Sequence, residues 1–375
     1  MEAKYKKIKR SIKSKILEGL IMPHEKISSE SELMRQFNVS RHTVRLALGE
    51  LVSEGWLYRE QGAGTFCTDR TNRDQYQSQE NPTKNIAIVT TYISEYIFPS
   101  IIRGAEAHLS KEGYHVSIFN TNNKYDQEKQ ILSKILAGNY DGIIIEPTNS
   151  ASSNPNLRYY LNLERENIPY VMINASYEEL EPVSFMMDDV KGGYLQTKHL
   201  IELGHQHIAC IYKTDDAQGQ KRLKGYIKAH RDLDILLNPK NIITYQTENE
   251  LSTPITGLKK LLNNKLDRPT AVVCYNDQLV LRLMDYLREE GLKIPEDLSF
   301  VGYDDSLLSA ISEVKLTSVI HPKSRLGLDA AKAIISMIKK NDGIRSNRGI
   351  SKLYEPELQI RQSTIRLNKN LAKVE

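Results

Sequence analysis

The sequence predicts two unequal parts, a small α+β domain with a β-hairpin followed by a much larger α/β domain of two lobes with parallel sheets. Three observations lead to this prediction. The first 70 residues hold three short helical patterns and a glycine-rich hairpin pattern, and apolar strand patterns alternate with amphipathic helix patterns from Asn85 onwards. With 375 residues, 40% of them hydrophobic, the chain is also long enough to bury more than one core.

The positive charge of the chain is concentrated at its N-terminus. The first 70 residues contain 13 lysines and arginines against 9 acidic residues, and the remainder contains 38 of each. The net charge of +4 therefore resides entirely in the first segment. Because phosphate binding depends on local basic patches and not on overall charge, the small domain is a candidate for nucleic-acid binding. A basic tail that only improves solubility would not carry a packed-domain pattern.

The cysteines, the apolar runs and the histidines indicate the compartment of the chain and whether it binds a membrane, a metal or a cofactor. Cys67, Cys210 and Cys274 are far apart, so they predict neither a disulfide framework nor a metal site, and a reducing cytoplasm is the simplest compartment. The N-terminus has no long apolar run, so no signal peptide, transmembrane helix or membrane partner is expected. His205 and His207 lie where a helix ends and a strand begins, and no phosphate-cradling glycine loop occurs, so no metal or cofactor is expected.

The first two helices are expected near the N-terminus. Apolar residues recur at helical spacing from Tyr5 to Ile16, and lysines and arginines decorate the rest of this helix. A second short helix is expected after Ser29, because Glu32 follows at the spacing of a capping box. Asn38 can end this helix in a left-handed conformation.

The third helix begins at Ser40, whose hydroxyl can cap the first turn. Apolar residues from Val44 to Leu51 recur at helical spacing and would pack inward, whereas Arg41 and Arg45 lie four residues apart on the other face. Two guanidinium groups on one exposed face suit the acceptor edge of guanine in a major groove. On this stretch alone, a solvated face with ordinary arginines is an equally good interpretation.

A β-hairpin is expected after the third helix. Residues 56–60 and 65–67 have strand composition, and Gln61-Gly62-Ala63-Gly64 between them is glycine-rich. Two short helices joined by a tight turn and followed by such a wing form a winged helix-turn-helix. The tip of the wing lacks bulk, so its backbone could approach a minor groove closely.

This segment resembles the GntR family of winged helix-turn-helix repressors. Four runs carry the resemblance: Ser29-Glu30-Ser31-Glu32-Leu33, Val39-Ser40-Arg41-His42-Thr43-Val44-Arg45, Glu54-Gly55-Trp56-Leu57 and Gly62-Ala63-Gly64-Thr65-Phe66. The family often has proline where Ser28 stands and leucine where Trp56 stands, and neither position is an expected DNA contact.

The resemblance implies which residues contact DNA. It implies that Arg41 and Arg45 read bases and that Gly62 enters the minor groove. It further implies supporting contacts from Lys4, Glu30, His42, Thr43 and Gln61. Glu30 could accept from a cytosine amine or orient an arginine, but a first-turn charge favoured by the helix dipole explains it equally well.

A polar linker and the second domain follow. We place the first domain at residues 1–70, a flexible linker at 71–84 and the second domain at 85–375. The second domain alternates apolar strands with amphipathic helices, which indicates parallel sheets covered on both faces, and its length favours two lobes. The expected strands are 86–89, 116–119, 142–145, 171–173, 208–211, 271–274 and 298–301, with helices at 101–109 and 127–136.

Polar and aromatic residues follow the ends of these strands. Ligands of such folds lie beyond the carboxyl ends of the strands, so residues there are candidates for binding. Carboxylate, amide and guanidinium groups around aromatic rings suit a polyhydroxylated ligand, although each residue singly is better explained as a cap or turn. The candidates are Tyr92, Tyr96, Phe98, Glu146, Asn174, Arg222, Asn276 and Asp304.

The second domain resembles the LacI/GalR repressors and the periplasmic sugar-binding proteins. The matching runs are 188–194, 199–205, Cys274-Tyr275-Asn276-Asp277, 299–305 and 316–319. The resemblance implies effector contacts from Arg222, Asn276 and Asp304, with Asn174 and His321 at further contact positions. The helix-turn-helix and hinge helix of that family are absent, and the GntR-like segment replaces them.

The two parts together resemble the arabinose-responsive repressors of Gram-positive bacteria. This resemblance implies a homodimer that binds a palindromic double-stranded operator and is released by L-arabinose, although residue spacing does not distinguish arabinose from another small sugar. The alternative is a sugar-modifying enzyme with an accessory nucleic-acid-binding domain, but no nucleophile or acid–base pair stands in a recognisable setting. A transport binding protein is disfavoured by the DNA-reading segment.

Overall fold

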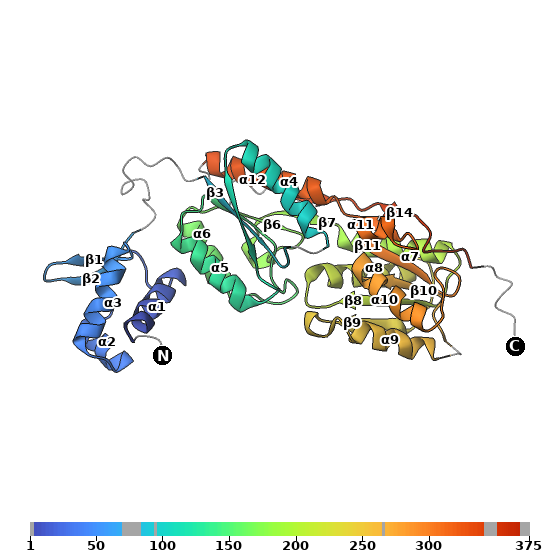
Figure 1. Ribbon diagram of the computed structural model, residues 1–375, viewed down its shortest axis with the longest axis horizontal. Helices are drawn as coiled ribbons and strands as arrows, with labels where there is room; N and C mark the ends of the chain where they lie inside the picture. Colours follow the sequence, from blue (N-terminus) through green and yellow to red (C-terminus); the bar gives the residue numbers. More distant parts are fainter. Residues whose placement is uncertain (1–3, 70–83, 94–95, 265–266, 341–350, 368–375) are drawn as a thin grey trace.

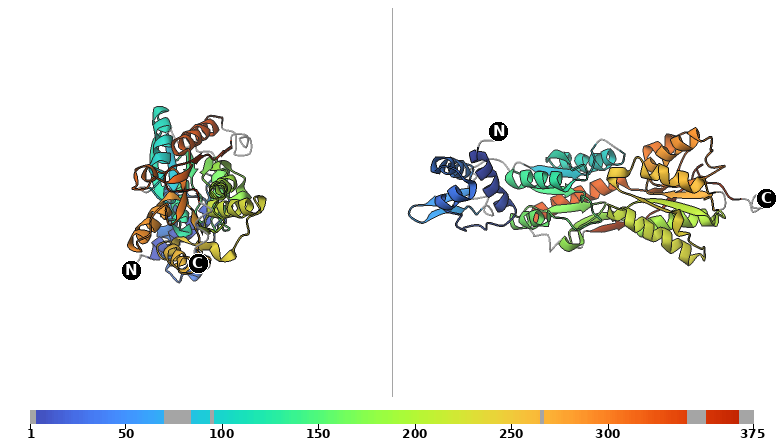
Figure 2. Two further views of the ribbon diagram at one scale, coloured as in Figure 1. Left: turned by 90° about the vertical axis from the view of Figure 1, so that its right-hand side faces the viewer. Right: turned by 90° about the horizontal axis from the view of Figure 1, so that it is seen from below.

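In the computed structural model, the described residues are 4–69, 84–93, 96–264, 267–340 and 351–367. They form a winged helix-turn-helix and two α/β lobes in a row, with the first lobe in the middle (Figure 1). The right-hand view of Figure 2 shows the same elongated arrangement from below. Of the predicted linker, residues 71–84, all but Lys84 lie outside the described residues.

The winged helix-turn-helix has the predicted element order. Both reciprocal bonds of the Ser29–Glu32 capping box are present, Asn38 ends its helix with a φ of 48°, and the side chain of Ser40 accepts a bond from the amide of Thr43. The elements are α1 (Lys4–Leu17), α2 (Glu30–Phe37), α3 (Arg41–Ser53) and the antiparallel strands β1 (Leu57–Glu60) and β2 (Gly64–Cys67). The predicted fold of this segment is confirmed.

A compact apolar core holds these elements together. Ile8 of α1 and Val44 and Leu51 of α3 are fully buried, and Trp56 is buried against them just before the hairpin. The inward face of α3 is therefore fixed by packing, which leaves its arginine face to solvent.

The first lobe is a six-stranded parallel sheet in the order β13-β7-β6-β5-β3-β4. Alternate residues of β3 point to opposite faces, so that Ala87 and Val89 pack toward α5 and α6 and Ile86 and Ile88 toward α4 and α12. The strands are β3 (Asn85–Thr90), β4 (His115–Asn120), β5 (Gly142–Ile145), β6 (Tyr170–Ile173), β7 (Val183–Met187) and β13 (Lys352–Tyr354). The helices are α4 (Phe98–Lys111), α5 (Tyr125–Ala137), α6 (Leu157–Arg165) and α12 (Lys323–Lys340).

The second lobe is a six-stranded sheet in the order β14-β12-β11-β10-β8-β9, parallel except for β14. Its core lies on both faces, toward α9 and α10 on one and toward α7 and α8 on the other. The strands are β8 (Ile208–Lys213), β9 (Ile242–Tyr245), β10 (Ala271–Cys274), β11 (Ser299–Asp304), β12 (Thr317–Ile320) and β14 (Leu358–Gln359). The helices are α7 (Asp189–Glu202), α8 (Ala217–Asp232), α9 (Thr253–Leu262), α10 (Asp277–Glu289) and α11 (Leu307–Ile311).

The chain passes repeatedly between the two lobes. One passage is at Asp188 between β7 and α7, another is at His321 and Pro322 between β12 and α12, and a further one joins β13 to β14. Such passages permit the lobes to rotate about a shared hinge. The polar residues at the strand ends of both lobes face a common cleft between them.

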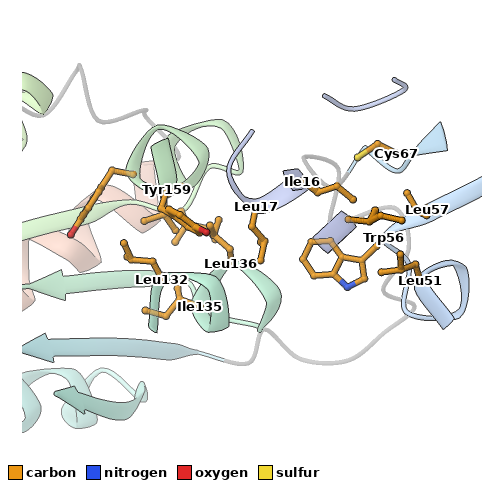
Figure 3. Close-up of a cluster of buried hydrophobic side chains, with 14 of the residues drawn as sticks. Ile16, Leu17, Leu51, Trp56, Leu57, Cys67, Leu132, Ile135, Leu136 and Tyr159 are labelled. Carbon is orange, nitrogen blue, oxygen red and sulfur yellow. The ribbon is translucent and has the colours of Figure 1, made fainter. Parts of the chain in front are cut away.

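A continuous cluster of buried apolar side chains links the winged helix-turn-helix to the first lobe. Leu17 at the end of α1 lies between Ile16 of the small domain and Leu136 of α5 (Figure 3). Among the described residues, no helix is long and apolar enough to cross a membrane.

Candidate functional site

The exposed face of α3 carries both arginines that the sequence singles out. Nε of Arg45 donates to Oε1 of Glu30 at 3.0 Å, and Nε of Arg41 lies 3.3 Å from Oε2 of the same carboxylate. The arginine side chains are 59% and 60% exposed, so their outer guanidinium nitrogens remain accessible. Glu30, at the start of α2, therefore holds the two guanidinium groups beside each other on one surface.

The remaining candidates for DNA contact are distributed over three elements. His42 and Thr43 lie in the first turn of α3, next to Arg41, and Lys4 is exposed at the start of α1. Gln61 and Gly62 lie exposed at the turn of the hairpin, where Gly62 has a φ of 79°. Nothing lies within 4 Å of a Cβ built on Gly62, so the backbone of the wing tip is open to an approaching surface.

A cavity between the two lobes brings together all the candidate effector residues. The cavity has a volume of about 120 Å³. The nine candidates that line it are Tyr92, Tyr96, Phe98, Glu146, Asn174, Arg222, Asn276, Asp304 and His321. Eight of them lie at or after the ends of strands in both sheets, as expected for a ligand at the carboxyl ends of parallel strands. Arg222, which was also expected at a strand end, lies instead within α8.

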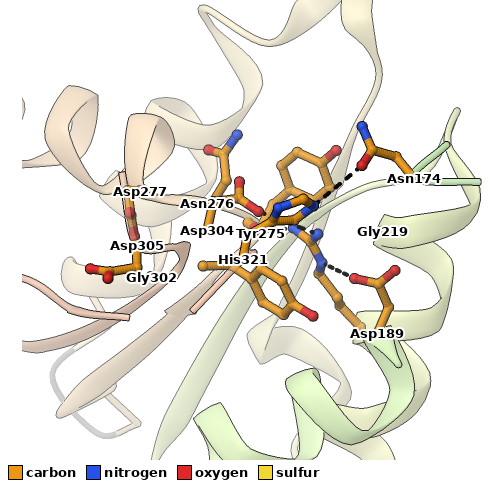
Figure 4. A network of polar contacts seen from close by, with 12 residues as sticks. Asn174, Asp189, Gly219, Tyr275, Asn276, Asp277, Gly302, Asp304, Asp305 and His321 are labelled. Atoms are coloured by element: carbon orange, nitrogen blue, oxygen red, sulfur yellow. Dashed lines mark hydrogen bonds and ion pairs between the residues drawn. The ribbon is translucent and has the colours of Figure 1, made fainter. Parts of the chain in front are cut away.

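Arg222 is the central charge of this cavity. Its Nε donates to Oδ1 of Asp189 at 2.8 Å, and its Nη1 donates to the carbonyl of Tyr275 at 2.6 Å. The guanidinium carbon lies 3.4 Å from the ring centroid of Tyr303, which adds a cation–π contact. Figure 4 shows Asp189 and Tyr275, two of its partners, beside Asp304 and His321. The forked guanidinium group of Arg222 is thus held in place by the protein alone.

The position of Arg222 depends on close helix packing. Helices α7 and α8 meet at Gly193 and Gly225, where an added Cβ would come within 2.2 Å and 2.1 Å of backbone oxygens of the other helix. This close approach places Arg222 of α8 beside Asp189 of α7.

Asp304 and His321 both present unpaired acceptors. Oδ1 of Asp304 is buried and accepts no hydrogen bond from the described residues, its nearest cationic group being Nη2 of Arg222 at 3.7 Å. Nδ1 of His321 is likewise buried and without a partner in the described part of the chain. Because burial lowers the pKa of His321 to about 3, its ring is neutral at pH 7.

The neutral ring of His321 has a defined tautomer. Nδ2 of Asn174 donates to Oε1 of Glu146 at 2.8 Å, which leaves Oδ1 of Asn174 facing Nε2 of His321 at 3.2 Å. Nε2 must therefore carry the proton, and the bare Nδ1 can only accept. Buried acceptors without donors are costly, so Asp304 and His321 indicate a ligand that donates hydrogen bonds, such as a polyol.

Left-handed backbone conformations gather around this cavity. Tyr96, Asn174, Asp304 and Asp305 have φ values of 61°, 64°, 90° and 44°. Such conformations are unusual for residues other than glycine and concentrate at ligand sites. They turn the side chains at the strand ends toward the cleft.

Tyr96 connects the two lobes across the cavity. Its hydroxyl donates to the carbonyl of Tyr303 at 2.9 Å and accepts from the amide of Asp277 at 3.1 Å. Asn276 combines two roles, because its Oδ1 caps α10 by accepting from the amide of Leu279 at 2.9 Å while the residue lines the cavity. The capping interpretation of the sequence thus holds for Asn276 together with a place at the cavity.

Several cavity residues are absent from the candidates that the sequence provides. Lys213 ends β8, with Nζ 3.7 Å from Oδ2 of Asp216, and the hydroxyl of Tyr275 donates to the same oxygen at 2.7 Å. The strand-end signal that identifies Asp304 applies equally to Lys213. Asp216 caps α8, where its side chain accepts from the amide of Gly219.

Asp277 follows the cavity-lining residue Asn276 and binds neighbouring serines with both carboxylate oxygens. Its Oδ1 accepts from Ser318 at 2.6 Å and its Oδ2 accepts from the amide of Ser306 at 2.7 Å. A Cβ at Gly302 would come within 2.1 Å of Oδ1, so only glycine fits there. Burial raises the pKa of Asp277 to about 7, above the value of about 3.9 expected in the unfolded chain.

This raised pKa predicts a pH-dependent stability. The folded state binds more protons than the unfolded state between about pH 4 and pH 7, so the contribution of Asp277 to stability falls as pH rises through this window. We expect Asp277→Asn, which cannot titrate, to gain in Tm relative to the wild type from pH 5 to pH 8. Thermal melts measure this difference, and Asp285→Asn at an exposed position of the same helix is the control. A Tm difference independent of pH would contradict the raised pKa.

Two family descriptions match the chain. "Bacterial regulatory proteins, gntR family" matches residues 4–67, and "Periplasmic binding protein-like domain" matches residues 197–364. The chain is 59% identical over 370 residues to the arabinose metabolism transcriptional repressor of Halalkalibacterium halodurans, with 97% of each chain covered. It is 46% identical over 366 residues to the repressor of the same name from Geobacillus stearothermophilus, with 96% of this chain and 97% of the relative covered.

The solved structures give a similar result for the two lobes. A LacI family transcriptional regulator from Enterococcus faecium with bound ribose superimposes with a TM-score of 0.64 at 25% identity. The match covers 76% of this chain and all of the other. The two-lobed fold is therefore that of the LacI-type sugar-binding domains.

Proposed function

Because the chain belongs to the family of arabinose metabolism transcriptional repressors, we propose that L-arabinose is the effector that releases it from DNA. The chain is a transcriptional repressor with a GntR-type DNA-binding segment and a LacI-type sugar-binding fold, and not an enzyme. The sugar-modifying enzyme considered from the sequence is therefore set aside.

The cleft chemistry carries the proposal of a sugar effector. The single strongest observation is the pair of buried acceptors, Oδ1 of Asp304 and Nδ1 of His321, that have no donor among the described residues. Sugar hydroxyls can donate to both, while the fixed fork of Arg222 donates to ring or hydroxyl oxygens. Tyr92 and Phe98, whose ring centroids are 6.0 Å apart, can cover the apolar face of a small sugar.

The exposed arginines carry the proposal for DNA reading. In it, Arg41 and Arg45 read bases in a major groove, and Gly62 brings the wing to a minor groove. We call the winged helix-turn-helix of one chain its reader. Five residues position the reader on DNA: Lys4, Glu30, His42, Thr43 and Gln61. One chain presents one recognition helix, so a homodimer on a palindromic operator would pair two readers with two half-sites.

The proposed division of labour assigns residues 1–70 to DNA, 71–84 to a linker and 85–375 to effector binding and dimerisation, in the cytoplasm. Sugar that binds the closed form of the cleft favours that form by population shift. If the closed dimer spaces its readers badly for the operator, sugar weakens DNA binding, and DNA weakens sugar binding by the same factor.

A thermal-shift panel on the purified chain tests the effector. L-arabinose, D-ribose, D-galactose, cellobiose and adenine are compared, followed by an operator-release titration with each compound that raises the Tm. A ligand of the folded state stabilises it by about 2.7 kcal/mol at a hundredfold excess over its Kd. We expect the largest shift and operator release with L-arabinose. Release by another compound without an arabinose response would overturn this effector assignment.

A further inference from the structure

The winged helix-turn-helix contacts the first lobe through the end of α1. Leu17 is 5% exposed and belongs to one cluster with Leu136 of α5 and Tyr159 of α6 (Figure 3). The contact is apolar at its centre, which distinguishes it from an incidental touch between two polar surfaces.

Polar contacts surround this apolar centre. Oε1 of Glu18 accepts from Nζ of Lys129 at 2.9 Å and from the hydroxyl of Tyr159 at 3.1 Å. Burial alone would raise the pKa of Glu18, but the hydrogen bonds from Lys129 and Ser14 lower it, so the carboxylate is charged at neutral pH. One carboxylate thus joins α1 to both helices of the lobe.

The end of α1 is completed by a side chain of the lobe. Nδ2 of Asn162, on α6, donates to the carbonyl of Leu17 at 2.9 Å and to that of Ile16 at 3.3 Å. The last carbonyls of a helix need such partners, which are normally water or a local cap. The carbonyl of Ile16 also accepts from the amide of Gly19 at 3.0 Å, whereas the partner of the Leu17 carbonyl belongs to the other domain. Undocking would therefore leave the carbonyl of Leu17 to solvent.

The residues behind this face belong to a buried polar network. Glu128, the neighbour of Lys129, accepts from the hydroxyl of Tyr160 at 2.7 Å and from Nδ2 of Asn156 at 2.7 Å. The hydroxyl of Tyr177 lies 2.9 Å from the same carboxylate and 2.8 Å from the carbonyl of Thr148. Such a fully bonded buried network holds α5 and α6 rigidly together.

The network reaches the rim of the effector cleft. Nδ2 of Asn123 donates across the cleft to Oγ1 of Thr247 in the second lobe at 3.0 Å, and its Oδ1 accepts from the amide of Asn149 at 2.7 Å. Tyr125, the first residue of α5, donates to the carbonyl of Asn149 at 3.1 Å. The start of α5 therefore lies at the contact that forms between the lobes, and its outer face contacts the DNA-binding domain.

We propose that the outer face of α5 and α6 is the docking surface for α1 of the same chain, through which closure of the cleft reaches the DNA-binding domain. This inference rests on the proposed release by L-arabinose. Two readers that are docked on their lobes keep a fixed separation in a dimer and move with the lobes. If the two readers were instead joined to their lobes by free tethers, closure of the cleft would not change their separation.

The test measures a coupling ratio, the operator Kd at saturating L-arabinose divided by the operator Kd without it. Full-length wild type is compared with Glu18→Lys, with Lys129→Glu and with the double variant that exchanges the two charges. Allosteric coupling is typically about 5- to 150-fold, so we expect each single variant to bring the ratio toward one and the exchanged pair to recover it to within about twofold of wild type. The arabinose Kd should stay the same in all four proteins, which shows that the cleft is folded.

Two further variants separate docking from general effects of charge and folding. Lys124→Glu makes the same charge change at the exposed start of α5 and should keep the wild-type ratio. Asn162→Ala removes the side chain that caps α1 and should lower the ratio without any change of charge. Wild-type ratios in Glu18→Lys, Lys129→Glu and Asn162→Ala would overturn the docking proposal while release of the wild type by arabinose upholds the proposed function. Absence of release from the wild type would overturn both.

Discussion

Arg45→Ala should remove most of the operator affinity of the repressor while leaving its affinity for L-arabinose unchanged. A bidentate arginine–guanine contact contributes about 1–3 kcal/mol, and the proposed dimer makes it at two half-sites. Tenfold in affinity corresponds to about 1.4 kcal/mol, so we expect a loss of about 30-fold to about 20,000-fold. Competition with a scrambled duplex separates this effect from phosphate binding, because the affinity for the scrambled sequence should fall far less.

The geometry of α3 explains why Arg45 should matter more than an average surface arginine. Glu30 restricts the Nε edges of both guanidinium groups, so less side-chain entropy is lost when their outer nitrogens meet bases. Arg231→Ala, at an exposed position of the second lobe, removes the same charge and is the matched control. If Arg45→Ala bound the operator within a few-fold of wild type, Arg45 would not be a base reader.

The strand-end principle explains why the effector cavity was predictable from the sequence. Glu146, Asn174 and Asp304 each follow a strongly apolar strand, and the carboxyl ends of parallel strands converge. All the candidates found in this way line one cavity. Arg222 was grouped with these strand-end residues, but it lies within α8, so the strand-end principle does not account for its place. The family resemblance was the other signal that implied a contact from Arg222.

Other features were not predictable because they depend on the arrangement of the lobes. The bridge from Tyr96 to Tyr303 and Asp277 joins residues about 200 positions apart and exists only when the lobes face each other. Strands β13 and β14 are too short to show a period of two, and their pairing is set by the last passages between lobes. Periodicity reports on local burial, and it contains no information about such distant pairings.

Glu18 illustrates the same limit at the domain boundary. A glutamate after an apolar stripe is an ordinary residue at a helix end, and the sequence predicted only a flexible tether between the two parts. The contact with Lys129 and Tyr159 depends on the outer surface of the lobe, which no local pattern specifies. The docking surface therefore differs from the effector cleft, whose residues the strand ends point to, because it is assembled from segments that are unremarkable on their own.

Asp304→Asn should produce the opposite phenotype to Arg45→Ala, a protein that still binds its operator but no longer responds to arabinose. The substitution keeps the size of the side chain and removes the charge that makes its buried Oδ1 a strong acceptor. A hydrogen bond to a charged group contributes about 1.5–3 kcal/mol, so we expect the arabinose Kd to rise about 10-fold to 150-fold. Isothermal titration with L-arabinose measures this directly.

The neighbours of Asp304 ensure that this result reports on the ligand and not on the fold. Arg222 remains paired with Asp189 at 2.8 Å and keeps its bond to the carbonyl of Tyr275, so its buried charge is still compensated. Asp234→Asn, at a surface loop, is the control for loss of one carboxylate. An arabinose Kd within threefold of wild type in Asp304→Asn would remove Asp304 from the site. Loss of operator binding in the same variant would show instead that Asp304 supports the fold of the lobe, since no part of the proposed DNA-reading surface lies near it.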